Sequence, residues 1–429
     1  MKYKNTTMAT SMLAMAVLLA ACGDQKAGQS ASSTAPAASA TASGAPEGGA
    51  APNTDAIRIG FVTDMSGVYS DIDGNAGAAA IQMAIDDFGG TVLGKKVELV
   101  SADHQNKADI AASKAREWVD QQNLQVMISG TNSGVAFATT KLMAERKKPV
   151  FVIGAGSSRL TNEDCTPYTV HYAYDTAALA RVAGQALMER GDKDWFFLTA
   201  DYAFGASLEK DATDIVTQGG GKVLGSVKHP LGASDFSSFL LQAQQSKAKV
   251  LAMANAGGDF INSVKAANEF GVTKDMKLAG LLVFINDVHA LGLKDAKGLL
   301  ATTSWYWDHD DDTRKFAKRF EEKFQRKPSM LQAADYSAAL TWLNAVKAVG
   351  STDGDKVMEH MKKTPINDMF VKDGKIREDG RLMQTMYLMQ VKSPEESKGP
   401  WDYYQELKAV PGDQAYLPLS ETKCSFVKK

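Results

Sequence analysis

The sequence contains few residues of the types that would point to several common functions. Its 429 residues include three cysteines and six histidines, too few for a disulfide-dense scaffold or a metal-rich protein. Lys and Arg total 48 and Asp and Glu total 50, so the chain lacks the basic excess of a nucleic-acid-binding protein and the acidity of a charged disordered chain. At roughly 100–200 residues per domain, this length predicts two or three domains, or one large two-lobed unit.

Long apolar runs are also scarce. Lys2 and Lys4 precede an apolar run over residues 12–21, which has the length of a signal-peptide core and is too short to cross a bilayer, where about 20 apolar residues are needed. The run ends at Leu19-Ala20-Ala21-Cys22, which resembles the bacterial lipobox and implies cleavage before Cys22 and lipid attachment to its thiol. An ordinary signal peptide with an unrelated cysteine is the alternative.

The segment after Cys22 has almost nothing apolar of any size. Residues 27–52 are Ala, Gly, Ser, Thr and Pro, apart from Gln29 and Glu47. Such a segment cannot offset its ordering entropy by burial. We therefore predict a signal peptide over residues 1–21 and a lipid anchor with a disordered tether over 22–55. This places the protein in the periplasm or on the outer face of the cell membrane, attached to the membrane through the lipid alone.

Two cysteines remain if Cys22 carries a lipid. Disulfides persist in oxidising compartments, so we expect one bridge between Cys165 and Cys424. That bridge would tie the C-terminal tail, residues 411–429, to the first lobe. Two free thiols are the alternative.

The body of the chain alternates short apolar runs with helical patterns, which indicates parallel sheets covered by helices on both faces. Strands are expected at residues 57–63, 97–100, 126–129 and 149–153, with helices at 76–88, 109–122 and 135–146. The pattern restarts with helices at 176–190, 206–218, 236–246 and 260–270 and strands at 195–199, 222–227, 250–254 and 278–284. Two such series predict two doubly wound α/β lobes. Beyond them, helices are expected at 314–324, 331–349 and 356–363, with extended segments at 299–307 and 386–391.

The segments that follow the predicted strands are small or polar. They comprise residues 63–67, 129–134, 154–158, 200–205, 255–258 and 285–287. Ligands of open α/β sheets bind beyond the carboxyl ends of strands. Glycine allows close backbone approach, and helix N-termini favour anions. Two lobes with such loops predict a cleft for a small carboxylate.

Catalytic and cofactor motifs are lacking. Residues 154–159 begin like a dinucleotide fingerprint, but Arg159 stands where the third glycine belongs. Residues 130–134 contain Ser133 without the Gly-x-Ser-x-Gly elbow, and the histidines show no metal-ligand spacing. We therefore predict a binding protein, with no enzymatic activity, cofactor, metal or nucleic-acid partner. The aromatic cluster Trp305-Tyr306-Trp307 either packs the hinge or forms a flat wall for a planar ligand.

Residues 57–88, the polar segments after the strands and the helical final third resemble the periplasmic substrate-binding proteins of branched-chain amino-acid-type ABC transporters. The resemblance covers residue 57 to the C-terminus. It implies two lobes that close on a ligand through three hinge crossovers, which we expect near residues 172–174, 302–304 and 350–351. The first lobe would contain residues 56–173 and 302–350, and the second lobe 174–301 and 351–410.

A subgroup that binds aromatic carboxylates is more similar still. The resemblance is carried by residues 194–205, 235–259, 278–293 and 396–404. In amino-acid binders an acidic residue of the second lobe holds the ligand ammonium group. Asn286 occupies or adjoins that position here, and only Asp287 could substitute, which weakens an amino-acid interpretation because a buried ammonium needs a partner.

The resemblance implies particular ligand-binding residues. Asn132, Ser133, Gly156 and Ser157 would hold the carboxylate, and Tyr202, Phe204, Trp305 and Tyr306 would enclose the ring. The remaining candidates, which lie on the same polar segments or beside them, are Met65, Ser66, Tyr69, Ala155, Asn255, Ala256, Phe284, Asn286 and Asp287.

The sequence thus predicts a lipid-anchored, monomeric solute-binding protein of an ABC importer. It would capture an aromatic acid of the benzoate or cinnamate type and deliver it to a permease and ATPase complex. A branched-chain amino-acid-binding protein and a ligand-sensing receptor with the same fold are the alternatives.

Overall fold

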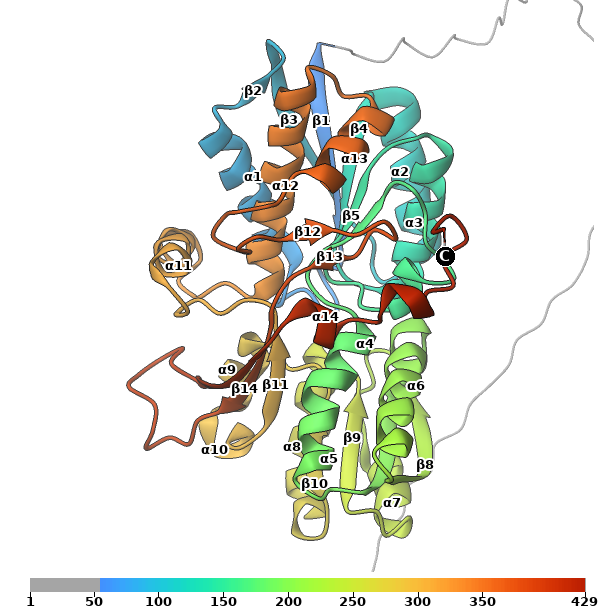
Figure 1. Ribbon diagram of the computed structural model, residues 1–429. Coiled ribbons are helices and arrows are strands. Elements are labelled where there is room, and N and C mark those ends of the chain that lie inside the picture. The colour runs from blue at the N-terminus through green and yellow to red at the C-terminus, as the bar shows by residue number, and fades with distance from the viewer. Residues whose placement is uncertain (1–54, 429) are drawn as a thin grey trace, which may run out of the picture. The chain divides into compact units, whose positions relative to one another are not determined.

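The computed structural model describes residues 55–428 (Figure 1). The predicted signal peptide, Cys22 and nearly all of the predicted tether lie outside the described residues. Within the described range, no helix combines the length and apolar character needed to cross a membrane.

The first lobe is built on a six-stranded sheet with strand order β2-β3-β1-β4-β5-β6, parallel except for the short β2. Its strands are β1 (Ala56–Thr63), β2 (Thr91–Val92), β3 (Lys95–Asp103), β4 (Leu124–Ser129), β5 (Val150–Val152) and β6 (Thr169–His171). Its main helices are α1 (Gly74–Phe88), α2 (Ala108–Gln122), α3 (Ser133–Glu145) and α12 (Met330–Val349), and a short 3-10 helix spans Ser158–Thr161. Helices α1 and α12 pack together on one face of the sheet, and α2 and α3 on the other (Figure 1).

The second lobe is built on a four-stranded parallel sheet with strand order β10-β9-β7-β8. Its strands are β7 (Asp194–Ala200), β8 (Lys222–His229), β9 (Val250–Ala254) and β10 (Lys277–Gly280). Its helices are α4 (Thr176–Leu179), a π-helical turn (Ala180–Gly184), α5 (Gln185–Glu189), α6 (Ala203–Gln218), α7 (Ser237–Gln245), α8 (Gly257–Glu269), a 3-10 turn (Val272–Lys274), α9 (Ile285–Leu291) and α10 (Leu293–Ala296).

A separate antiparallel sheet shares the core of the second lobe. It consists of β11 (Leu300–Thr303), β14 (Met386–Val391) and β15 (Tyr404–Val410), in the order β11-β14-β15. Ala301 and Met389 belong to the same buried cluster as Leu251 of β9, so this sheet packs onto the second lobe. Between β11 and α12 the chain forms α11 (Asp311–Phe324), which Asp310 caps by accepting from the Thr313 N–H at 2.8 Å.

The predicted alternation of strands and helices is confirmed, and the two doubly wound lobes follow from it. The predicted strand at residues 278–284 is shorter than expected, because β10 ends at Gly280 and the chain then turns toward the other lobe. Strand β15 was missed because its five central residues are exposed and Leu407 is the one large apolar residue among them, which gives no apolar run.

The third crossover lies elsewhere than expected. Gly350, which we expected at that crossover, instead ends α12 in a left-handed conformation with φ of 68° and stays within the first lobe. The chain returns to the second lobe at residues 384–385, between β13 (Leu382–Met383) and β14. There the Gln384 amide donates to the main-chain oxygens of Tyr172 and Ala173 at 2.8 and 2.9 Å, so the first and third crossovers lie side by side.

The assignment of all of residues 351–410 to the second lobe is corrected in part. Helix α13 (Gly354–Lys363) packs against α12, and its Asp355 accepts hydrogen bonds from Tyr168 and Lys147 of the first lobe. The hairpin of β12 (Lys375–Ile376) and β13 follows on the same side. The amphipathic pattern of α13 predicts which face is buried, but it does not say against which lobe.

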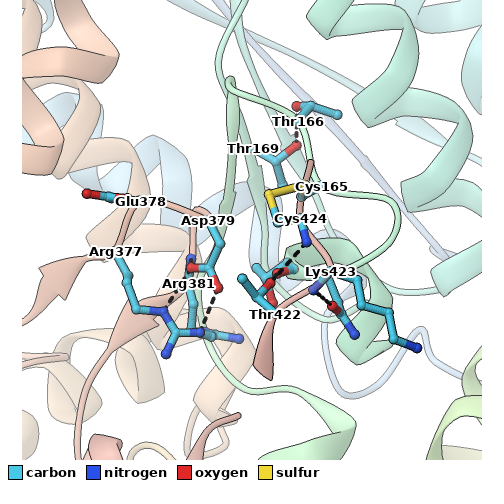
Figure 2. The surroundings of a disulfide bond; sticks show 12 residues. Cys165, Thr166, Thr169, Arg377, Glu378, Asp379, Arg381, Thr422, Lys423 and Cys424 are labelled. Carbon is cyan, nitrogen blue, oxygen red and sulfur yellow. Dashed lines mark hydrogen bonds and ion pairs between the residues drawn. A yellow bond between two sulfur atoms is a disulfide. The ribbon is translucent and has the colours of Figure 1, made fainter. Parts of the chain in front are cut away.

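The C-terminal tail makes a fourth connection between the lobes. After β15 the chain forms α14 (Gly412–Ala415) beside α4, and then a 3-10 turn (Leu419–Glu421) (Figure 1). It ends on the first lobe, where Thr422 donates to the Thr161 oxygen at 3.1 Å and Cys424 forms a disulfide with Cys165 (Figure 2). The predicted bridge is confirmed, and it covalently fixes a segment that runs from one lobe to the other.

Replacing Cys424 with serine should lower the free energy of unfolding by about 2–5 kcal/mol, because the bridge closes a long loop in the unfolded chain. The two cysteines are 259 residues apart in the sequence. Denaturant unfolding under non-reducing conditions measures the effect. The wild type unfolded in the presence of a reductant should match the variant, and an unchanged midpoint in both would show that the bridge adds no stability.

Candidate functional site

A cavity of about 250 Å³ of empty space lies where the carboxyl ends of the two parallel sheets face each other. Both lobes and the first crossover contribute to its wall. The lining residues are Tyr69, Ile72, Thr131, Asn132, Ser133, Gly154, Gly156, Tyr174, Tyr202, Phe204, Ala256, Leu282 and Phe284.

The first-lobe wall contains the start of helix α3. Asn132 has a φ of 74°, and its side-chain oxygen accepts from the N–H groups of Gly134 and Val135 at 3.0 and 3.2 Å. This cap sets the direction of the first turn and places Ser133 at the cavity. The Ser133 hydroxyl oxygen accepts from the Ser157 N–H at 3.1 Å, which leaves the hydroxyl hydrogen available to donate. A helix N-terminus with a hydroxyl donor is suited to an anion.

Gly156 allows the two lobes to approach closely. A Cβ at this position would lie 2.8 Å from the Tyr174 ring and 3.1 Å from the Phe204 ring, nearer than carbon atoms pack. The residue therefore has to be glycine for the rings of the crossover and of α6 to reach this end of β5.

Two tyrosines join the lobes across the cavity. The hydroxyl oxygens of Tyr69, in the first lobe, and Tyr202, in the second, are 2.6 Å apart. Burial raises the pKa of Tyr69, and likewise that of Tyr202, well above the ordinary value, so both hydroxyls keep their protons and one donates to the other. Beside them the Gly258 N–H donates to the Val68 oxygen at 2.9 Å. The lobes are thus in contact across the cleft, in a closed conformation.

The rest of the wall is largely aromatic. Its rings belong to Tyr69, Tyr174, Tyr202, Phe204 and Phe284. The Tyr174 and Phe284 rings meet edge to face with centroids 6.3 Å apart, and the Tyr202 and Phe204 centroids are 6.1 Å apart. Aromatic faces and edges arranged in this way fit a flat, apolar ligand.

No charged side chain lines this cavity in the described part of the chain. Asp287 caps helix α9, where its carboxylate accepts from the Phe284 N–H at 2.9 Å, and burial raises the pKa of Asp287 to about 7. The Asn286 amide donates to the main-chain oxygen of Asp71 at 3.2 Å, a contact between the lobes. Both residues lie near the cleft, yet neither belongs to the cavity wall.

The structure brings eight of the predicted ligand-binding residues together in the cavity wall. These are Tyr69, Asn132, Ser133, Gly156, Tyr202, Phe204, Ala256 and Phe284. The predicted residues that do not line it are Met65, Ser66, Ala155, Ser157, Asn255, Asn286, Asp287, Trp305 and Tyr306.

Several of these outlying residues have other partners. The Ser66 hydroxyl is exposed and donates to Asp103 at 2.5 Å, and the Met65 N–H donates to the same carboxylate at 3.1 Å. The Asn255 amide contacts the His229 ring nitrogen at 3.1 Å inside the second lobe. Ala155 packs in the core beneath α2 and α3.

Ser157 bonds across the lobes without lining the cavity. Its hydroxyl donates to the Ser207 hydroxyl at 3.0 Å. This bond is one more link that holds the closed conformation.

The aromatic cluster at residues 305–307 packs around the second crossover. The Trp305 indole donates to the Met369 oxygen at 3.0 Å, and its ring meets Phe316 edge to face. The Tyr306 hydroxyl donates to the Trp401 oxygen at 3.3 Å. Trp305 and Tyr306 line a separate hollow of about 490 Å³, so of the two interpretations drawn from the sequence, hinge packing is the one that these contacts support.

Sequence reasoning missed five lining residues: Ile72, Thr131, Gly154, Tyr174 and Leu282. Thr131 and Gly154 lie inside the polar segments that were singled out, and Tyr174 lies in the first crossover. Ile72 and Leu282 are apolar residues with no sequence signal that separates a cavity wall from a core.

This geometry defines a class: a two-lobed α/β protein that encloses a small ligand between the carboxyl ends of two parallel sheets. Residues 56–400 match the periplasmic binding protein family. The chain belongs to that family, whose fold has the two lobes and hinge crossovers that the sequence predicted.

Solved structures agree with this assignment. A periplasmic binding protein from Burkholderia mallei is 59% identical, with a TM-score of 0.87 over 88% of this chain and 100% of that one. A branched-chain amino acid ABC transporter periplasmic ligand-binding protein from Burkholderia xenovorans LB400 is 40% identical, with a TM-score of 0.76 over 86% and 99%. An ABC transporter solute-binding protein from R. palustris in complex with benzoate shares the fold at 20% identity, with a TM-score of 0.76 over 86% and 100%.

Removing either hydroxyl of the tyrosine pair should weaken the closed conformation. Tyr69→Phe and Tyr202→Phe should each lower its stability by about 0.5–1.5 kcal/mol, the net value of one hydrogen bond. Small-angle scattering of the ligand-free protein should show a larger radius of gyration. The closed conformation of the double variant should be destabilised no more than that of either single variant, since the same hydrogen bond is removed in all three. Additive losses of stability would mean that the two hydroxyls act separately.

Proposed function

We propose that this protein is the solute-binding component of an ABC importer and that its ligand is a small aromatic carboxylate of the benzoate or cinnamate type. The observation that carries the proposal is the composition of the cavity wall: five aromatic rings, a helix N-terminus with a serine hydroxyl, and no charged side chain among the described residues.

The first lobe would hold the carboxylate. Ser133 offers its hydroxyl hydrogen, and the N-terminus of α3 contributes the positive end of its dipole. Asn132 and Gly156, which also line the cavity, would supply main-chain groups. Ser157 would act behind them, since its N–H is already bonded to Ser133.

The rings of both lobes would enclose the rest of the ligand. Tyr202, Phe204 and Phe284 come from the second lobe and close over the ring when the cleft shuts, while Tyr69 and Tyr174 complete the wall.

A branched-chain amino acid is the second candidate, supported by the description of the relative from Burkholderia xenovorans. Its ammonium group would need an acidic partner, because a buried unpaired charge is costly. Asp287 is the nearest predicted partner, but it caps α9 and lies outside the cavity wall. The benzoate complex from R. palustris supports the first candidate, in that the same fold accommodates an aromatic acid.

The remaining parts of the proposal concern the membrane anchor and the partners of the protein. Lipidation of Cys22 would hold the monomeric protein at the membrane, and the closed form would be recognised by a permease and ATPase complex. We propose transport without catalysis, without cofactor or metal, and without nucleic acid as a partner. A ligand-sensing receptor would share the cavity but lack the transporter.

A thermal-shift screen of the folded body tests the ligand class. Benzoate, 4-hydroxybenzoate and cinnamate should raise the unfolding temperature, since a ligand at a hundred times its Kd adds about 2.7 kcal/mol of stability. Leucine and valine serve as the comparison. Stabilisation by leucine with no response to any aromatic acid would contradict the proposal.

Ser133→Ala should weaken binding of the stabilising acid about 10- to 100-fold, because hydrogen bonds to charged groups contribute about 1.5–3 kcal/mol. Titration calorimetry measures the change. Ser66→Ala is the matched control, since Ser66 is exposed and bonded to Asp103 outside the cavity. Equal affinity in both variants would remove Ser133 from the site.

A further inference from the structure

Two carboxyl groups are buried together beneath the cavity. Asp73 precedes helix α1 and Asp335 lies in the second turn of α12, the helix packed beside it, and both side chains are completely buried. They converge on Gly77, where a Cβ would lie 2.3 Å from Asp73 Oδ1 and 2.6 Å from Asp335 Oδ2. Glycine at that position leaves room for two carboxyl groups to meet.

Few other polar groups satisfy this pair. Asp73 Oδ2 accepts from the Thr63 hydroxyl at 2.5 Å. Among the described residues, Asp73 Oδ1 and both oxygens of Asp335 have no hydrogen-bond donor unless one carboxyl group is itself protonated. A protonated carboxyl group can supply that donor to its neighbour.

The surrounding charges also favour a retained proton. The titratable groups that face Asp73 are Asp64, at the end of β1, and Tyr174, in the first crossover, and Asp73 is the group that faces Asp335. No cation in the described chain forms an ion pair with either carboxyl group. Burial raises the pKa of Asp73 to about 6, and burial together with the charge of Asp73 raises the pKa of Asp335 well above its usual range.

The pair is connected to the cavity wall through Thr63. Its hydroxyl oxygen, which donates to Asp73, also accepts from the Thr131 N–H at 3.3 Å. Thr131 lines the cavity and leads directly into Ser133 and helix α3. A Cβ at Gly130 would lie 2.2 Å from both Asp73 Oδ2 and Thr63 Oγ1, so the loop is seated tightly on the carboxyl group.

We infer that Asp73 and Asp335 share one proton and act as positioning residues for the loop 130–133. In this arrangement Asp335 donates a hydrogen bond to Asp73, and Asp73 accepts one from Thr63. Thr63 in turn holds Thr131 in place. Loss of the proton places two like charges in the core and displaces the loop that carries Ser133. The effect on ligand binding rests on the proposed function, whereas the proton sharing does not.

The sign of the pH dependence follows from the direction of the shifts. Both carboxyl groups have raised pKa values when folded, so the pair keeps at least one proton at acidic pH. Relative to an unfolded Asp with a pKa of about 3.9, stability falls as the pH rises through the raised values. Ligand affinity should fall over the same range, while the ligand carboxylate itself stays ionised.

Asp335→Asn tests the inference, because its amide donates to Asp73 as the acid does but does not titrate. Unfolding temperature without ligand, and Kd for benzoate and for leucine, are measured from pH 5 to pH 9. As the pH rises, the wild type should lose affinity for whichever probe it binds. The loss should be about tenfold for each unit by which the pKa of the carboxyl pair differs between the ligand-bound and the ligand-free protein. Asp335→Asn should lose the pH dependence that the pair contributes and so show a shallower profile than the wild type, and Asp335→Ala should bind weakly at every pH.

Asp86→Asn, on the exposed face of α1, is the matched control and should keep the wild-type profile. A protonated-carboxyl infrared band at neutral pH that is stronger in the wild type than in Asp335→Asn would support proton sharing. If that variant does not fold, the same comparison with Asp335→Ala decides, because Asp287, whose pKa is raised to about 7, contributes a band of its own. A wild-type pH slope in Asp335→Asn, or no such difference in the band, would overturn the inference. Binding of leucine but not benzoate would contradict the proposed ligand class and leave this test intact.

Discussion

The guanidinium group of Arg381 is completely buried where three segments of the chain run between the lobes. It donates to the main-chain oxygens of Tyr172 and Tyr174 at 2.6 and 3.0 Å, and lies 3.5 Å from Asp175. Its other side faces the ring of Tyr416 at 4.5 Å. A buried cation must be paired and hydrogen-bonded, or it destabilises the fold. The first crossover, the third crossover and the tail are therefore held in one arrangement.

Around the cleft, the carboxyl groups lie behind the cavity wall. The cavity wall carries no charged side chain among the described residues, while carboxyl groups lie directly behind it at Asp73 and Asp335 and near it at Asp287. Burial raises the pKa of all three. The anionic ligand that we propose would meet hydroxyls and a helix N-terminus, and the proton shared by Asp73 and Asp335 reduces the negative charge behind the wall. A cationic ligand would find no ionised partner in the wall.

The sequence was informative where a residue's role is local. The alternation of apolar runs predicted both parallel sheets, and the small or polar segments after the strands predicted the cavity edge, including Asn132, Ser133 and Gly156. The sequence was uninformative where a residue's role depends on the direction in which its side chain points. Asn255 follows a strand as Ser133 does, but it points into the second lobe toward His229. Trp305 suggested a ligand wall as strongly as Phe204 did, yet it packs on Phe316.

The sequence alone therefore determined the element order, the two-lobed class and the pairing of Cys165 with Cys424, since each follows from periodicity, composition or counting. Tertiary structure decided which polar segments meet, where the chain returns to the second lobe, and that Asp73 and Asp335 share one buried site. The physical reason is distance along the chain. Asp73 and Asp335 acquire their unusual environment only when α1 and α12, far apart in sequence, pack together, and no local pattern records that contact.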